Sequence, residues 1–102
     1  MGTRIELREK LKDICPNLYF QPPSSEKLIY PCIIYHRVGG QALHADNGVY
    51  AFKFAYEIMV VDRDPDSEIV ERLTKFMSGL PFTYNSHYTK NNLNHDVFTL
   101  YY

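Results

Sequence analysis

Four histidines are the side chains of this sequence best suited to acid–base chemistry or metal binding, because imidazole titrates near neutral pH. Two of them stand beside a carboxylate in short polar segments, His44-Ala45-Asp46 and Asn94-His95-Asp96. No two histidines have the i, i+4 spacing of a metal-binding helix, and His36 and His87 lie in other segments. We therefore expect neither a metal site nor catalytic residues, and we expect these histidines to form hydrogen bonds at a surface or an interface.

The other residue types give no better support to catalysis or ion binding. None of the serines has the glycine-rich elbow of a hydrolase nucleophile, and Gly39-Gly40 stands outside any phosphate-binding pattern. Asp62, Asp64 and Asp66 alternate as in a calcium loop, but Pro65 interrupts them and the required glycine and distal glutamate are missing. These aspartates fit a turn and a helix cap better, so we expect no enzyme and no cofactor.

The composition of the chain indicates its number of domains and the classes of function that it fits. The chain of 102 residues suffices for a single domain, 1–102, and 45% hydrophobic with 23% charged residues is a globular composition. The 11 basic and 12 acidic residues give a net charge of −1, which argues against a nucleic-acid binder. Cys15 and Cys32 are expected to be free, buried thiols. Nine tyrosines and six phenylalanines exceed what a small core needs, which favours a protein interface.

Two segments have helical periodicity. Thr3 and Glu6 form a capping box ahead of apolar residues at helical spacing, which predicts a helix over 3–15. The second helix is predicted over 65–78, with Asp64 as its N-cap and an apolar stripe along one side.

The remaining segments have strand character. Residues 28–38 are β-rich, and residues 49–62 alternate aromatic and aliphatic side chains on one face. A strand of about fourteen residues reaches about 46 Å, against a diameter of about 33 Å for a compact domain of this size. It must therefore bend or project, and with 28–38 it forms a long hairpin whose connection, 39–48, stands away from the core. Shorter strands are predicted at 17–21, 82–89 and 97–102, with a polar turn over 90–96.

This order of elements predicts an α+β fold with a mainly antiparallel sheet, a long β-hairpin, and two helices packed on one face. Four stretches of the sequence also resemble small tail proteins of tailed bacteriophages. They are Tyr30-Pro31-Cys32-Ile33-Ile34-Tyr35, then Ala45-Asp46-Asn47 with Tyr50, then Val61-Asp62-Arg63-Asp64-Pro65-Asp66-Ser67, and finally Asn92-Leu93-Asn94-His95-Asp96-Val97-Phe98-Thr99-Leu100-Tyr101.

The resemblance runs from Leu28 to Tyr101 and is nearest to the tail terminators, also called tail-to-head joining proteins. Its most specific blocks are 62–67 and 92–100. It implies a small α+β domain with a sheet flanked by helices. It also implies a non-catalytic ring, usually a hexamer, that caps the last ring of the tail tube, halts tube growth and offers a surface to the head connector.

The same resemblance implies the partners and the location. The partners are further copies of the chain, the tail tube protein and the head–tail connector or stopper protein. Genome DNA passes through the lumen of the ring without specific binding, and no membrane is involved, since no apolar run of the sequence is long enough to span one. The protein would be part of the virion, in the tail or neck, after assembly in the host bacterial cytoplasm.

Two segments are our candidates for contacts in such a ring. The hairpin 28–62 would reach a neighbouring subunit or the tube. The segment 90–96 would be a docking loop, or alternatively a tight turn held by asparagine side chains. The candidate residues on the hairpin are Tyr35, His36, Arg37, Gln41, His44, Asp46, Asn47, Tyr50 and Lys53. Those of the loop are Asn92, Asn94, His95 and Asp96.

Two other functions remain open from the sequence. One is a head-completion or stopper protein of the same neck. The other is a small ligand-binding module or enzyme with a cleft of tyrosines and histidines. That second alternative would require several of the four histidines to converge, whereas the sequence spreads them over separate segments.

Overall fold

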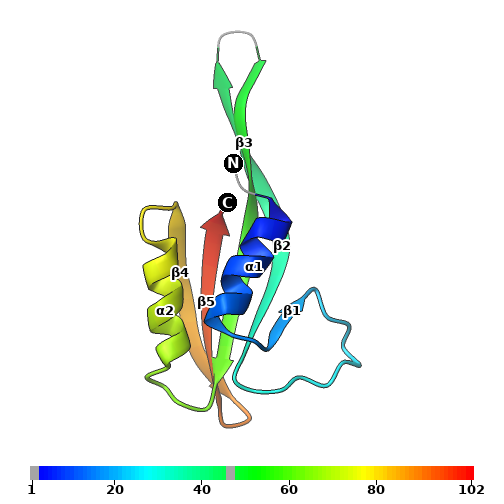
Figure 1. The fold of residues 1–102 in the computed structure, drawn as a ribbon, viewed down its shortest axis with the longest axis vertical. Helices are drawn as coiled ribbons and strands as arrows, with labels where there is room; N and C mark the ends of the chain where they lie inside the picture. The colour runs from blue at the N-terminus through cyan, green and yellow to red at the C-terminus, as the bar shows by residue number, and fades with distance from the viewer. Residues whose placement is uncertain (1–2, 46–47) are drawn as a thin grey trace.

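The computed structural model describes residues 3–45 and 48–102, except for the side chains of residue 41 and residues 43–51. The elements are α1 (Arg4–Ile14), β1 (Leu18–Phe20), β2 (Cys32–Ala45), β3 (Gly48–Asp62), α2 (Glu68–Met77), β4 (Phe82–Lys90) and β5 (Leu93–Tyr101). Within the described residues, five strands form one sheet in the order β1-β2-β3-β5-β4, antiparallel except for the β1–β2 pair. Both helices lie on the same face of this sheet (Figure 1), which confirms the predicted α+β architecture.

Helix α1 begins where its capping residue predicts. The side-chain oxygen of Thr3 accepts a hydrogen bond from the backbone N–H of Glu6 at 3.1 Å, which satisfies one of the free donors at the helix start. Leu7 and Leu11, one turn apart, are fully buried against the sheet. The predicted range 3–15 is thus confirmed to within one residue at each end.

Helix α2 begins later than predicted, and its N-cap is Ser67 rather than Asp64. The carboxylates of Asp62 and Asp64 each accept the backbone N–H two residues further on, at 3.0 and 2.9 Å. These two successive Asx turns hold the chain in a non-helical path. The helix therefore starts only after Ser67, whose Oγ accepts the N–H of Ile69 at 3.2 Å.

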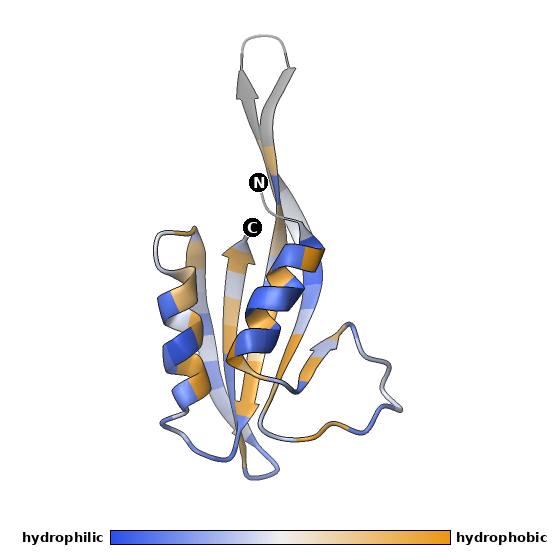
Figure 2. Ribbon diagram, in the orientation of Figure 1, coloured by the Kyte–Doolittle hydropathy of each residue, from blue (hydrophilic) through white to orange (hydrophobic). Residues whose placement is uncertain are grey.

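The core lies between the two helices and the sheet. Figure 2 shows apolar residues on the sheet-facing sides of the helices and polar residues on their outer sides. The buried cluster takes Leu7, Leu11 and Cys15 from the α1 region, Ile69, Leu73 and Met77 from α2, and Ile33, Tyr35, Tyr56, Ile58, Val60, Phe98 and Leu100 from the strands. The aromatic and aliphatic face predicted along 49–62 is confirmed for its buried members Tyr56, Ile58 and Val60.

The β2–β3 hairpin is longer than the body that carries it. Its strands pair from Cys32 opposite Val61 to Ala45 opposite Gly48, and the molecule measures 51 Å by 28 Å by 23 Å. β1 pairs only with residues 33–35 of β2, and β5 pairs with β3 only from Ala55 onwards. Beyond those points the hairpin is two-stranded and projects from the body (Figure 1). We call this part, residues 38–45 and 48–54, the arm.

The predicted connection over 39–48 is corrected by this pairing. Gly39 and Gly40 are not part of a loop but lie in β2, opposite Ala55 and Phe54. An irregularity in the register at Val38 takes up one extra residue, as a β-bulge does, after which the ladder continues. The predicted projection of the hairpin is confirmed, but the arm is a paired ribbon over most of its length.

The turn between β4 and β5 is shorter than the predicted range 90–96. Asn91 and Asn92 have φ values of 54° and 62°. Two successive residues with positive φ are the signature of a two-residue type I′ hairpin turn, in which asparagine is well tolerated. β5 therefore begins at Leu93, and Asn94, His95 and Asp96 are strand residues.

Both cysteines are free and buried, as predicted. Burial raises the pKa of the Cys15 thiol, and it raises the pKa of Cys32 to about 12. A thiol reacts through its thiolate, so neither group is an activated nucleophile. In the part of the chain that the structure describes, no helix is long and apolar enough to cross a bilayer.

Candidate functional site

The base of the arm is held by one arginine and two aromatic rings. The guanidinium carbon of Arg37, at the last regular position of β2 before the bulge, lies 3.8 Å from the centre of the Phe54 ring and 5.6 Å from that of Tyr56. Its Nη2 also donates to the hydroxyl of Tyr56 at 3.3 Å. A cation stacked on an aromatic face is attracted by the negative face of the ring. The contact fixes the side chains at the point where the arm leaves the body.

The rings at this point belong to a continuous ladder that runs from the core into the arm. Successive ring centres are 4.8, 6.3, 6.4 and 5.0 Å apart, which are the spacings of interacting aromatic pairs. The ladder consists of Phe20, Tyr35, Tyr56, Phe54 and Phe52. Part of the aromatic surplus in the sequence is therefore used to connect the arm to the core.

Gly39 and Gly40, at the start of the arm, have different surroundings. A Cβ added to Gly40 would lie 2.6 Å from Cζ of Phe52 and 3.2 Å from the carbonyl oxygen of Lys53, so Gly40 lets the Phe52 ring lie directly on the ribbon. A Cβ added to Gly39 would meet nothing within 4 Å. The backbone at Gly39 therefore borders open space, where another chain can approach closely.

Four of the nine predicted contact residues have described side chains. Tyr35 is fully buried in the core, which corrects its assignment to a contact surface. Arg37 is exposed, and Lys53 is half-buried on β3. The side chain of His36 is 38% exposed, and its Nε2 lies 3.6 Å from Oε1 of Glu57 on the neighbouring strand.

For the other five predicted contact residues, the structure gives at most the position of the backbone. The backbone places Gln41 and His44 on β2 and Tyr50 on β3, all within the arm, but their side chains lie outside the described part. Asp46 and Asn47 lie outside the described residues altogether. Their role in contacts stays a prediction.

The predicted docking loop is mostly a strand. Asn92 alone lies in the turn, where it is exposed. Nδ2 of Asn94 donates to the carbonyl of Arg63 at 3.2 Å, and the ring of His95 is stacked on Tyr88 with 4.6 Å between ring centres. Asp96 is 5% exposed, and its carboxylate accepts a hydrogen bond from the hydroxyl of Tyr84. Three of the four residues thus hold the sheet together, and a docking role stays a prediction for Asn92.

A hydrogen-bonded cluster that the sequence analysis missed surrounds Asp96. The hydroxyl of Tyr84 donates to its Oδ1 at 2.7 Å, and Nδ1 of His87 donates to the same oxygen at 2.6 Å. The bond to Asp96 raises the pKa of His87 and also that of Tyr84. Both donors lie on β4, so the cluster ties this outer strand to β5 through its side chains.

This cluster predicts a pH dependence of stability. Since the pKa of His87 is raised on folding above its ordinary value of 6.5, its contribution is fully present below about pH 6.5 and is lost as pH rises through the higher, folded value. We expect the stability difference between the wild type and His87→Gln to shrink as pH increases from 6 to 9. Urea unfolding of both proteins across this range measures it. A difference that stays constant or grows would contradict the assignment.

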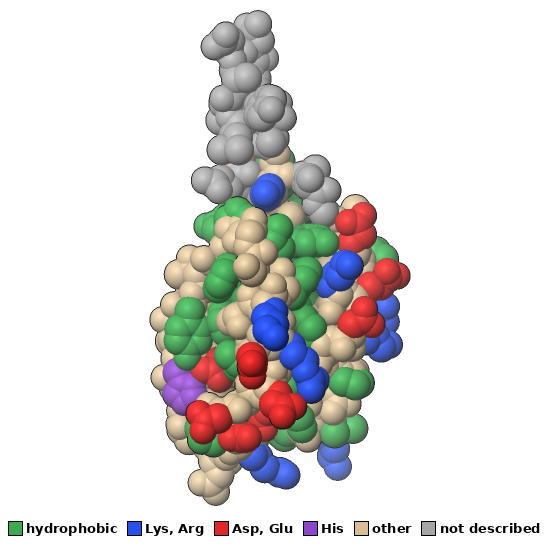
Figure 3. All heavy atoms as spheres, turned by 60° about the vertical axis from the view of Figure 1, so that its left-hand side comes forward, with side chains coloured by type: hydrophobic (Ala, Val, Ile, Leu, Met, Phe, Trp, Pro, Cys, Tyr) green, Lys and Arg blue, Asp and Glu red, His purple; other side chains and the backbone are tan. Residues whose placement is uncertain are grey.

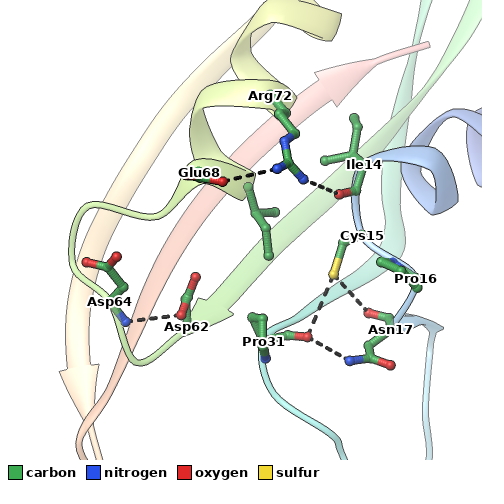
Figure 4. A pocket seen from close by; sticks show the side chains of 10 residues that line it. Ile14, Cys15, Pro16, Asn17, Pro31, Asp62, Asp64, Glu68 and Arg72 are labelled. Atoms are coloured by element: carbon green, nitrogen blue, oxygen red, sulfur yellow. Dashed lines mark hydrogen bonds and ion pairs between the residues drawn. The ribbon is translucent and has the colours of Figure 1, made fainter.

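The hollow shown in Figure 4 lies where the end of α1, the start of β2 and the start of α2 meet. Arg72 donates to the carboxylate of Glu68 at 3.1 Å and to the carbonyl of Ile14 at 3.4 Å. The Cys15 thiol lies 3.7 Å from the carbonyl oxygens of Asn17 and Pro31, both of which accept from it. The polar groups of this hollow are thus engaged in joining the three elements.

The described histidines do not share one cleft. His36 lies on β2 and pairs with Glu57, His87 lies on β4 in the Asp96 cluster, and His95 on β5 is stacked against Tyr88. The side chain of His44 lies outside the described part. Figure 3 shows one group of acidic side chains near the end of the body that is remote from the arm, and others along the right-hand side of the body. Among the described residues, no group of three or more histidine, cysteine or acidic side chains is placed to hold a metal ion.

Among the described residues, the most distinctive surfaces are the arm and the outer strand β4. When the chain is compared with known protein families and with curated proteins, no family model and no curated sequence matches it.

Proposed function

We propose that this chain is a ring-forming tail terminator of a tailed bacteriophage. It would be a structural, non-catalytic virion protein that caps the tail tube, stops its polymerisation and provides the surface that joins the tail to the head connector. The observation that carries this proposal is the arm, a paired ribbon that projects from a small body and is anchored in its core by Arg37 and the aromatic ladder.

The fold is consistent with the family that the sequence resembles. That family implies a small α+β domain with helices flanking a sheet, and this chain has such a domain. The two most specific blocks of the resemblance lie in structured segments. Residues 62–67 form the capped entry to α2, and residues 92–100 form the β4–β5 turn and most of β5. The resemblance thus involves residues that shape the entry to α2 and the inner strand β5.

A projecting ribbon suits a protein that must end a polymer. The growing end of a tail tube exposes an edge that templates the next ring. A terminator has to match that edge on one side while offering a different surface on the other. In a cyclic ring each subunit contacts its neighbours through two different patches, and such contacts close on themselves. The arm can supply one of these patches without disturbing the core.

The proposal includes the environment of the ring. The partners would be further copies of this chain, the tail tube protein and the head–tail connector or stopper. Genome DNA would pass through the lumen without being gripped, which is compatible with a net charge of −1. The protein would assemble in the host bacterial cytoplasm and remain in the tail or neck of the virion.

Light scattering over a range of protein concentrations tests the proposal, together with sedimentation in the presence of isolated tails and of filled heads. We expect a particle near 72 kDa, six times 12.0 kDa, and association with tails. A protein that is monomeric at every concentration and does not bind tails would overturn the proposal. Association with filled heads instead of tails would show a head-completion or stopper protein of the same neck.

A further inference from the structure

Strand β4 is an open edge of the sheet. It is the last strand in the order β1-β2-β3-β5-β4 and pairs only with β5 within the described residues. All nine of its residues are exposed, including Phe82 at 37%, Tyr84 at 51% and Tyr88 at 41%. An edge strand presents a row of unpaired backbone N–H and C=O groups, to which another strand can bind.

This edge lacks most of the features that normally prevent strands from pairing. Proteins protect long edges with proline, with several charged side chains, or by keeping the edge strand short. β4 contains no proline, and its one lysine, Lys90, stands at its end. Its one irregularity is a shift of register between Tyr84 and Ser86. A nine-residue, aromatic and nearly uncharged edge is therefore available to a partner strand.

The same chain carries a second open strand edge, on the arm. β1 pairs with β2 only at residues 33–35, so the outer edge of β2 beyond that point has no strand partner among the described residues. This stretch, Val38–Ala45, contains no Asp, Glu, Lys or Arg and is of nearly the same length as β4. The two edges therefore match in length, and no like charges oppose each other.

The residues at the two edges are also complementary in size. The arm edge contains Gly39 and Gly40, and an added Cβ at Gly39 would meet nothing within 4 Å. β4 carries three large aromatic side chains that are partly exposed, Phe82, Tyr84 and Tyr88, although one side of the Tyr84 and Tyr88 rings packs on Phe98 and His95 of β5. An aromatic side chain packed across strands on a glycine covers backbone that would otherwise stay hydrated, and such pairs stabilise sheet edges.

We propose that β4 of one copy of this chain binds edge to edge to the Val38–Ala45 stretch of β2 on the arm of a second copy. The two patches differ, so the contact is heterologous, and each copy would bind one neighbour through β4 and the other through the β2 edge of its arm. Repetition around an axis joins the five-stranded sheets of neighbouring copies. The inference rests on the self-assembly contained in the proposed function and identifies the surface that receives the arm.

Hydrogen–deuterium exchange of the full chain at low and high protein concentration tests this contact without any substitution. Alternate amides of an edge strand point outward and exchange freely until a partner strand covers them. We expect the assembled protein to gain protection in β4 and in residues 38–45 together. Assembly without added protection in β4 would overturn the inference and leave the proposed ring intact. A protein that is monomeric at every concentration would also overturn this edge-to-edge contact. Binding to isolated tails would then decide the proposed function separately.

A matched pair of variants adds a second measurement. Ser86→Lys places a charge in the middle of the β4 edge, and Ser25→Lys makes the same change at an exposed position in the loop before β2. We expect Ser86→Lys to need at least about tenfold more protein than Ser25→Lys to assemble, which corresponds to about 1.4 kcal/mol at the contact. Equal assembly of the two variants would contradict the use of this edge.

Discussion

A variant in which Asn-Gly replaces residues 41–53 is expected to fold, to stay monomeric and to fail to cap tails. Gly40 and Phe54 are cross-strand partners, so a two-residue turn can join them with little distortion. Among the side chains that the structure describes, the buried cluster takes none from between these two positions, and we expect the core to survive the deletion. The predicted loss is complete rather than partial, because the variant removes the paired ribbon that we expect neighbouring copies to bind.

Circular dichroism and thermal unfolding give the control for this variant. A spectrum and a cooperative transition close to those of the full chain would show that the body has folded. Sedimentation with isolated tails then measures capping. A truncated protein that folds and still caps tails like the full chain would show that the arm is not the assembly element. The milder shortening of residues 40–47 is expected to act in the same direction, with the domain folded and ring formation or tail capping impaired.

Phe98→Ala is expected to cause a large loss of stability. Phe98 is 1% exposed on β5, lies opposite Ile58 and Tyr84, and its ring centre is 5.0 Å from that of Tyr84. Removing a buried phenylalanine typically costs about 3–5 kcal/mol, against a total stability of about 5–15 kcal/mol. We expect a protein that is partly unfolded at room temperature or unfolds at a much lower urea concentration.

Phe82→Ala is the matched control for that experiment. Phe82 lies on the adjacent strand β4 and is 37% exposed, so the same truncation removes much less buried surface. We expect its cost to be about 1 kcal/mol or less. Urea unfolding measures both variants under identical conditions. Similar losses for the two variants would contradict the placement of the Phe98 side chain in the core between the helices and the sheet.

Elements with strong local signals were predicted well from the sequence. The capping residue Thr3 and the apolar residues at helical spacing located α1, and the alternation along 49–62 located β3 and its excess length. The start of α2 was misplaced because Asp64 and Ser67 are both suitable N-cap residues by type. Asp64 is a good N-cap by residue type, but its carboxylate is used by the preceding Asx turn, which only the three-dimensional path of the chain shows.

Ambiguous dipeptides caused the larger errors. Gly39-Gly40 is typical of a loop, yet in this chain both glycines lie in the paired strand β2, and the ring of Phe52 on β3 lies directly on Gly40. Asn91-Asn92 is typical of a polar loop of any length, yet it forms a turn of two residues. Each error shifted a strand boundary by several residues, since strands are defined by their partners and not by their own residues alone.

The contacts of the candidate surfaces depend on register, which the sequence does not reveal. Arg37 can stack on Phe54 because the bulge at Val38 sets their relative positions. His87 meets Asp96 because the intervening turn has only two residues, which places these residues opposite each other on β4 and β5. One residue more in either place would turn these side chains to opposite faces of the sheet.

The aromatic ladder connects the arm rigidly to the body, so the two are expected to move as one unit. A force applied along the arm passes from ring to ring through Phe54 and Tyr56 to Tyr35, and so reaches the side chains packed beneath α1. Tightly packed interiors transmit strain because they have little empty volume in which to absorb it. A subunit bound by its arm would therefore be held through its core, and in the proposed ring a force on the arm would be carried by the whole domain.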